Sequence, residues 1–376
     1  MNIRPAAALR RAASLVFALM PPLSAAAGLK GLALLASGGV DLVPAFSAQV
    51  TSYRAQVPGD VSDVFVQADT VGFATRVHVS VDGRPGDSKA PTHVRLDVGE
   101  NRIDIAVVSA LGRDAGHYRI VVEREDVLPV AATFLRRTFV DAQAGRAMPY
   151  RLYVPSAGGT KRSYPLVVFL HGGGERGDDN ERPLVANQGG LAWAKPQEQA
   201  QRPAYVLVPQ ARPTWDGGFA RVRNAQNHGD FKHAFEASED LLTAGRLLQQ
   251  VLAEFPDIDR KRIYLTGISE GGLGSWAWSL LQPDLFAAIV PVCGGADPAA
   301  MSALRHLPVW AFHAAADPVV PVSLTRNAIE ALRAAGGQPR YTEYDRSTYL
   351  YPTAHFSWVP AYRDEEMRAW LFRQSR

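Results

Sequence analysis

Cysteine is almost absent from this sequence of 376 residues, which contains only Cys293. A single cysteine excludes a disulfide framework within the chain and a zinc site built from several thiolates. Long apolar runs are missing as well, because no stretch reaches the roughly 18–20 residues that a membrane-spanning helix needs. We therefore expect no integral membrane segment once any leader is removed.

A charge excess of one sign is also lacking. The formal net charge is +3, and the three basic residues of the first 27 positions, Arg4, Arg10 and Arg11, account for all of it. The remainder of the chain is formally neutral, so a nucleic acid is not expected as a partner.

Residues 1–27 have the organisation of an export signal. A basic stretch ends at Arg11, an apolar stretch follows, and Ala25 and Ala27 fit an A-x-A cleavage site before Gly28. The apolar stretch is interrupted by two prolines and is too short to span a bilayer. We predict a signal peptide over 1–27 and a periplasmic or secreted protein, exported by the Sec or the twin-arginine route.

Residues 28–125 show an apolar period of two, which is typical of half-buried strands. Val77, Val79 and Val81 alternate with polar residues, and turn signals such as Asp82-Gly83 separate the runs. We expect a β-sandwich of about seven strands. The strings GLALLASGGVDLVPAFSAQVTSYRAQV and DVGENRIDIAVVSALGRDAGHYRIVVER resemble the cadherin-like β-sandwich module of exported bacterial proteins. The resemblance implies an immunoglobulin-like fold and no chemistry of its own.

Residues 131–376 alternate continuous apolar runs with helical stretches, which predicts an α/β domain with a mostly parallel sheet covered by helices on both faces. The expected strands are 149–154, 164–170, 204–208, 262–266, 287–292 and 308–312, and the expected helices are 237–254, 272–282, 323–335 and 362–373. Ligands of such sheets bind beyond the carboxyl ends of the strands, so chemistry is expected in the loops that follow them.

A G-x-S-x-G string lies between the strand 262–266 and a helical run, and it contains Ser269. In this context the serine occupies a strained turn, and Gly267 and Gly271 let strand and helix approach closely. The hydroxyl then projects from the sheet edge, and the Glu270 N–H points into the same space at the helix N-terminus.

A serine nucleophile needs a base that an acid holds in orientation, and both should follow later strands. Asp317 follows the strand 308–312, and the only histidine after it is His355. We therefore predict Ser269, Asp317 and His355 as a catalytic triad, with Asp297 and Asp345 as alternatives for the acid.

The glycine-rich loop after the strand 164–170 is the expected source of a second oxyanion donor. We assign this role to the Gly173 N–H, with Gly174 as the alternative, beside the Glu270 N–H. The loop contains neither G-x-x-x-x-G-K-[ST] nor G-x-G-x-x-G opening a helix, so nucleotide binding is not expected. No metal and no organic cofactor are implied.

The region 147–373 resembles the α/β-hydrolase superfamily, through PLVVFLHGGGERGDDN, IYLTGISEGGLGSWAW and LPVWAFHAAADPVVPV among other strings. It is most similar to the exported esterases related to polyhydroxybutyrate depolymerases and feruloyl esterases, whose members are often labelled predicted peptidases. The resemblance implies the same triad and a small-molecule or polymer-borne ester as substrate. A serine peptidase of the same fold and a non-catalytic binding or adhesion protein are the alternatives.

Several features differ from those relatives or bear on the pocket. Glu270 stands where many relatives have methionine or glutamine, and Phe356 where many have Asp or Asn. The stretch 345–354 is long for the family and could form one wall of the pocket. Trp215 and Trp358 are candidate substrate contacts. The alternatives are packing of a long loop for Trp215 and packing behind the histidine for Trp358.

Overall fold

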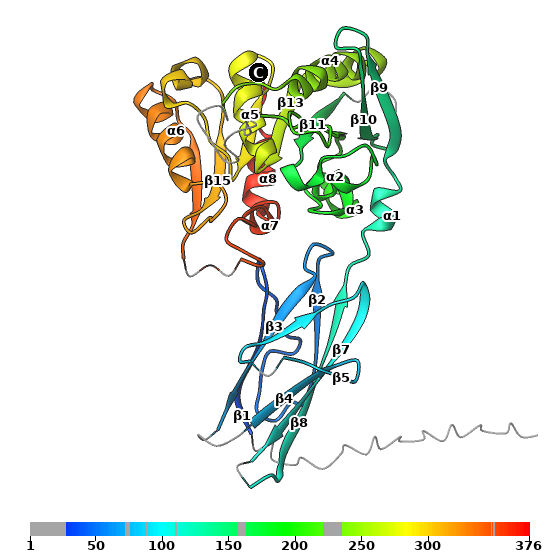
Figure 1. The fold of residues 1–376 in the computed structure, drawn as a ribbon, viewed down its shortest axis with the longest axis vertical. Coiled ribbons are helices and arrows are strands. Elements are labelled where there is room, and N and C mark those ends of the chain that lie inside the picture. The colour runs from blue at the N-terminus through cyan, green and yellow to red at the C-terminus, as the bar shows by residue number, and fades with distance from the viewer. Residues whose placement is uncertain are drawn as a thin grey trace, which may run out of the picture.

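The computed structural model describes residues 28–376 apart from 72–75, 88, 110, 157–162, 221–234, 347 and 349. A sandwich of strands comes first, and a domain with one large sheet and several helices follows it (Figure 1). The predicted signal peptide over 1–27 lies outside the described residues. Within the described part of the chain, no helix has both the length and the apolar composition to cross a membrane.

The first domain contains two sheets that share one apolar core. The smaller sheet has the order β1 (Leu29–Leu35), β3 (Asp63–Thr70), β6 (Thr92–Arg95), and the larger has the order β2 (Ser52–Val57), β8 (Asp114–Arg124), β7 (Gly99–Val108), β4 (Arg76–Val81), β5 (Arg84–Pro85). Alternate residues such as Ile103, Ile105 and Val107 are buried between the sheets, as the period of two predicts. The sandwich is confirmed, with eight strands in its described residues instead of about seven.

The second domain is built on an eight-stranded sheet whose central strands are parallel. Its order is β16 (Arg340–Tyr344), β15 (Trp310–Ala314), β14 (Ala288–Val292), β13 (Ile258–Ile268), β11 (Tyr164–Leu170), β12 (Tyr205–Pro209), β10 (Arg146–Tyr153), β9 (Leu135–Asp141). In the described residues, the antiparallel pairs of this sheet are β9 with β10 and β10 with β12. Every residue of β11 is buried, because helices cover both faces of the sheet.

The helices divide between the two faces. Helices α4 (Glu239–Glu254) and α6 (Val322–Ala334) pack with the core that contains Leu166, while α2 (Arg182–Val185), α7 (Trp358–Ala361) and α8 (Glu365–Phe372) pack with the core that contains Val167. The remaining α-helices are α1 (Leu128–Ala131), α3 (Pro196–Gln201) and α5 (Glu270–Leu281). This arrangement confirms the predicted α/β class with an N-terminal β-sandwich.

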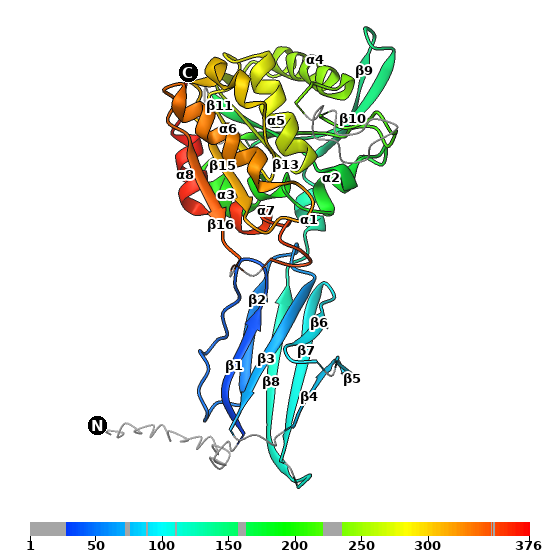
Figure 2. The same ribbon diagram turned by 60° about the vertical axis from the view of Figure 1, so that its left-hand side comes forward.

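The two domains meet near residues 350–357, the segment that precedes α7. Both views show this segment passing close to the end of the sandwich that faces the larger domain (Figures 1 and 2). Two ion pairs cross the boundary, Arg363–Asp60 at 2.6 Å and Lys195–Glu125 at 2.6 Å. The segment carries His355, one of the predicted triad residues, so the boundary lies near the candidate site.

Candidate active site

Ser269 lies in the sharp turn between β13 and α5. Its φ of 54° falls in the left-handed region, which residues with a side chain rarely adopt. A Cβ added to Gly267 would lie 2.3 Å from the Gly271 carbonyl oxygen, and one added to Gly271 would lie 2.0 Å from the Leu170 carbonyl oxygen. The glycines on both sides of the serine are therefore required by close backbone contact, as the G-x-S-x-G string predicts.

The structure brings Ser269, His355 and Asp317 into one line of hydrogen bonds. His355 Nε2 lies 2.9 Å from Ser269 Oγ, and His355 Nδ1 lies 2.8 Å from Asp317 Oδ2. Because a carboxylate can only accept, Nδ1–H donates to Asp317 and Nε2 is left to accept the serine proton. The tautomer that a general base needs is thus set by Asp317.

Asp317 is held as a carboxylate although its side chain is fully buried. Burial raises the pKa of Asp317, but hydrogen bonds from His313 and His355 and the Val319 N–H outweigh it and bring the pKa well below its ordinary value. Its Oδ1 also accepts the Val320 N–H at 3.0 Å. The negative charge that would stabilise a protonated His355 is therefore present at neutral pH.

His313 is a residue of this site that the sequence analysis missed. Its Nε2 lies 3.1 Å from Asp317 Oδ2, and its Nδ1 lies 2.7 Å from Thr325 Oγ1. The imidazole is completely buried at the end of β15, four residues before Asp317. The pairing of a histidine with an aspartate four positions later is the signal that could have revealed it.

The alternatives for the acid lie in local turns. Asp297 accepts the Ala299 N–H at 2.9 Å and caps a short 3-10 helix, Pro298–Leu304. Asp345 accepts the Thr348 N–H at 3.0 Å. The aspartate that reaches His355 is Asp317, the first choice of the sequence analysis.

The loop after β11 is organised by two buried side chains. Gly172 N–H donates to Glu175 Oε2 at 2.8 Å, which uses that amide and leaves Gly173 and Gly174 as the oxyanion candidates. His171 Nδ1–H donates to the Gly172 carbonyl at 2.7 Å, and His171 Nε2 accepts the Ala211 N–H at 3.0 Å. The loop is fixed from both sides before any substrate binds.

Burial shifts the pKa of both side chains toward the neutral form. It raises the pKa of Glu175 to about 7, against the Gly172 N–H bond that lowers it, and it lowers the pKa of His171 to about 4. His171 is therefore neutral at pH 7, in agreement with its one donated and one accepted hydrogen bond.

Glu270 connects the start of α5 to this loop. A Cβ on Gly173 would lie 3.2 Å from Glu270 Oε2, so the side chain lies against the candidate oxyanion residue. Arg176 Nε lies 3.7 Å from the same oxygen and donates to the Gly173 carbonyl at 2.9 Å. Arg176 and Glu270 thus join the two segments from which the two predicted oxyanion amides come.

Residues 157–355, more than half of the chain, match the profile of the family described as phospholipase/carboxylesterase. The chain belongs to this family. Residues 31–125 match the profile of the cadherin-like β-sandwich domain. This member of the phospholipase/carboxylesterase family therefore carries a cadherin-like sandwich before its α/β-hydrolase domain.

Named relatives of this family member include esterases. The crystal structure of a thermostable esterase is 28% identical and has a TM-score of 0.63, over 86% of this chain and 99% of that one. A protein of Nocardia uniformis subsp. tsuyamanensis assigned as an esterase, NocK, is 28% identical over 228 residues, and this chain spans 58% of its length. The structure of a ferulic acid esterase is 14% identical, with a TM-score of 0.46, over 63% of this chain and 98% of that one.

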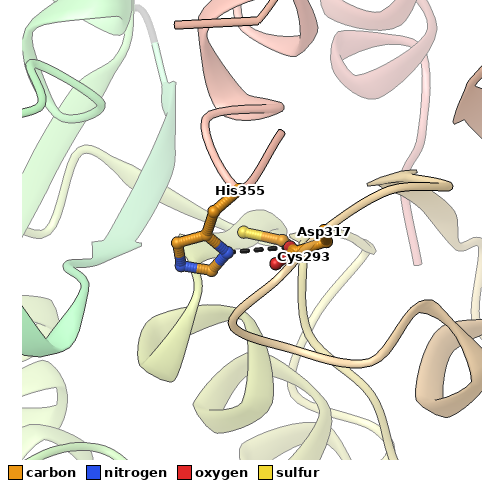
Figure 3. A group of neighbouring side chains, drawn as sticks. All are labelled: Cys293, Asp317 and His355. Carbon is orange, nitrogen blue, oxygen red and sulfur yellow. Dashed lines mark hydrogen bonds and ion pairs between the residues drawn. The ribbon is translucent and has the colours of Figure 1, made fainter. Parts of the chain in front are cut away.

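Cys293 completes a group of three side chains that could be considered as metal ligands in this family member. Cys293 Sγ and ligand atoms of Asp317 and His355 all lie within 4.8 Å of one another (Figure 3). A tetrahedral ion bonded at about 2.0–2.1 Å to nitrogen and oxygen would hold them more than about 3 Å apart. The 2.8 Å bond between His355 and Asp317 is shorter than that and leaves no place for an ion between them.

The Cys293 thiol has a structural contact with the nucleophile turn. Ser269 N–H lies 3.2 Å from Cys293 Sγ and 3.0 Å from the Val292 carbonyl. Burial raises the pKa of Cys293, so the sulfur stays a thiol. We regard it as part of the support for the turn.

The two candidate substrate contacts differ in exposure. Trp215 is 66% exposed and Trp358 is 4% exposed. The Trp358 ring lies edge-on to His355, with centroids 5.3 Å apart, and packs on Phe356 at 4.4 Å. Trp358 thus packs against the histidine, while Trp215 remains a predicted contact for substrate.

Proposed function

We propose that this member of the phospholipase/carboxylesterase family is an exported serine hydrolase that cleaves carboxylic esters through Ser269, His355 and Asp317. The observation that carries the proposal is the unbroken series of bonds from Ser269 Oγ to His355 and on to Asp317, at 2.9 and 2.8 Å. Family membership and the esterase relatives support the ester as substrate class.

The reaction follows from where protons and charges can go. His355 Nε2 accepts the Ser269 proton as Oγ attacks the acyl carbon, and the N–H groups of Gly173 and Glu270 bind the oxyanion. The imidazolium, stabilised by Asp317, then protonates the alcohol oxygen as the ester C–O bond breaks. Water attacks the acyl-enzyme, gives its proton to His355, and the carboxylic acid leaves as Ser269 regains a proton.

The decisive experiment is ester turnover by the purified chain with and without the nucleophile. Ser269→Ala should reduce kcat for p-nitrophenyl esters by about 10⁴–10⁶-fold, because the acyl-enzyme can no longer form. Ser279→Ala is the matched control, since Ser279 is a buried serine of α5, the helix that follows Ser269, and it donates to the Ser275 carbonyl. Equal turnover by the Ser269 variant and the wild type would refute the proposal.

The substrate panel separates esters from amides. It contains p-nitrophenyl esters of increasing acyl length, methyl ferulate and a peptide p-nitroanilide. The panel is needed because the same acyl-enzyme chemistry serves both ester and amide bonds. Turnover of the anilide alone would mean that the protein is a serine peptidase and not an esterase.

Export is tested by where the protein accumulates. We infer from residues 1–27 that expression in a Gram-negative host places the mature chain in the periplasm or medium, with a mass that corresponds to cleavage after Ala27. An uncleaved chain in the cytoplasm would contradict the inference.

A further inference from the structure

The segment that carries His355 is bonded at both ends to one turn of the cadherin-like sandwich. Tyr351 N–H donates to Ser37 Oγ at 2.7 Å, and Ser37 Oγ also lies 3.3 Å from the Tyr351 carbonyl. At the other end, Arg363 donates to the Ser37 carbonyl at 2.7 Å. Ser37, which is only 5% exposed, therefore bonds to both ends of the segment 351–363.

The Tyr351 side chain lies on an aromatic surface of the sandwich. Its ring centroid is 5.2 Å from that of Phe65 and 5.7 Å from that of His93, which are opposed across β3 and β6. Asp63 accepts a hydrogen bond from His93 at 2.6 Å and so fixes the imidazole. The Tyr351 hydroxyl is 3.4 Å from His93 Nε2, so ring packing is the main contact.

His355 lies between these two anchors. Its backbone N–H donates to Thr353 Oγ1 at 3.2 Å, and its ring packs on Trp358, both within the same segment. These contacts set the conformation of His355 relative to the segment. The contacts to Ser37, Phe65 and His93 set the position of the segment relative to the rest of the molecule.

We propose that the cadherin-like sandwich is a positioning element of the active site: Ser37 and the Phe65–His93 surface hold the segment 351–363, and thereby hold the His355 imidazole within reach of Ser269. The inference rests on the proposed function, because it matters only if His355 is the base. A base must lie about 2.6–3.2 Å from the proton it takes, and a displacement of about 1 Å can reduce the rate 100-fold. Ser37 and Tyr351 are positioning residues, since they act through His355.

The test uses the full chain and separates kcat from KM. Tyr351→Ala should reduce kcat for a p-nitrophenyl ester about 10–100-fold with KM within about twofold, because binding is retained while the base is displaced. Tyr351→Phe should restore most of kcat, since the ring packing remains. Phe65→Ala should also lower kcat. Combining it with Tyr351→Ala should cause little further loss, because both substitutions remove the same ring contact.

The matched control removes a contact between the domains that lies outside the segment 351–363. Lys195→Met breaks the 2.6 Å ion pair with Glu125, which involves no residue of the segment 351–363. It should leave kcat unchanged. An equal loss of kcat in this variant, or wild-type kcat in Tyr351→Ala, would overturn the proposal.

Hydrogen exchange provides a readout that does not depend on activity. Ser37→Ala, a small change that should leave the thermal midpoint nearly unaltered, should speed amide exchange in the peptide 351–363, and Lys195→Met should not. Unchanged exchange in Ser37→Ala would overturn the positioning role. If exchange responds but the wild type hydrolyses no ester in a Ser269-dependent way, the proposed function fails and the anchoring of the segment stands.

Discussion

Ser269 and His355 bond to each other, yet they are held by different kinds of structure. Around Ser269 the constraints are backbone atoms: Gly271 faces the Leu170 carbonyl at a distance that admits no side chain. Around His355 the constraints are side chains such as Thr353 and Trp358, and the segment that carries them is held by side chains of another domain, as the Ser37–Tyr351 bond shows. Ser269 is fixed by the sheet itself, while the position of His355 depends on a contact between sequence-distant residues.

This difference leads us to expect different responses to mutation. Backbone contacts in a closely packed interior cannot relax, so a change near Ser269 should affect folding as a whole. Side-chain contacts at a domain boundary can be lost while both domains stay folded, so changes near His355 should affect the rate more than stability.

The largest expected effect is that of Gly271→Ala. The added methyl would lie 2.0 Å from the Leu170 carbonyl oxygen, so β11 and α5 must separate. We expect a loss of several kcal/mol in the free energy of unfolding, or no soluble protein. Thermal unfolding and soluble yield check this.

Gly245→Ala is the matched control for that substitution. Gly245 lies within α4, and its nearest neighbour to an added Cβ is 3.8 Å away on Trp278. We expect the free energy of unfolding of the variant to rise by about 0.5–1 kcal/mol, because alanine favours a helix more than glycine does. A Gly271→Ala protein that melts like the wild type would show that the turn is not fixed by its backbone.

The same difference explains what the sequence could reveal. Ser269, Asp317 and His355 were selected because the G-x-S-x-G string is local and because acid and base follow strands in a fixed order. Their proximity in the structure agrees with that choice, and their catalytic roles remain predictions. The contact between Ser37 and Tyr351 joins residues 314 positions apart and follows no motif, so nothing in the sequence indicated it.

The sheet shows a similar limit. Its central strands were predicted because residues such as those of β14 are buried on both faces and form continuous apolar runs. The two edge strands, β9 and β16, were not predicted, and their sequences LRRTFVD and RYTEY are largely polar. An edge strand has fewer neighbours, so it needs fewer apolar side chains and leaves a weaker pattern.

A smaller effect is expected where the glycine-rich loop after β11 contacts α5. Arg176 donates to the Gly173 carbonyl at 2.9 Å and to the Gly217 carbonyl at 3.0 Å, with its side chain only 10% exposed. Arg176→Ala releases Gly173 and removes the cation beside Glu270. We expect kcat to fall about 10–100-fold, less than the about 100–1,000-fold that follows the loss of an oxyanion donor itself, because the Gly173 N–H is still present.

The companion variant separates the two consequences. The double variant Arg176→Met with Glu270→Gln removes both charges, so its free energy of unfolding should be higher than that of Arg176→Ala, which keeps the Glu270 charge. Its kcat should stay low, because the Gly173 carbonyl still lacks its donor. Recovery of kcat in the double variant would show that the Glu270 charge, and not the position of Gly173, controls the rate.

The smallest expected effect concerns the pH dependence of stability that arises from the glycine-rich loop after β11. Glu175 has a pKa raised from 4.5 to about 7 by burial, so between these pH values the unfolded chain is ionised while the folded chain keeps its proton. Its contribution to stability is therefore lost as pH rises from about 4.5 to 7. His171 has a pKa lowered from 6.5 to about 4, so its contribution is lost as pH falls over nearly the same range.

As pH rises, the Glu175 contribution to stability decreases while the His171 contribution increases, so in the wild type the two changes offset each other. Glu175→Gln removes the Glu175 contribution and leaves that of His171. The difference in melting temperature, variant minus wild type, should therefore increase from pH 4.5 to pH 7.5. The bond from the Asn187 N–H to Glu175 Oε1 is lost at every pH and adds only a constant. The corresponding change in the free energy of unfolding should not exceed about 3.5 kcal/mol, at 1.36 kcal/mol for each unit by which the pKa of Glu175 is raised. Calorimetry at four pH values measures the difference, and a constant or decreasing one would mean that Glu175 is ionised in the folded protein well below pH 7.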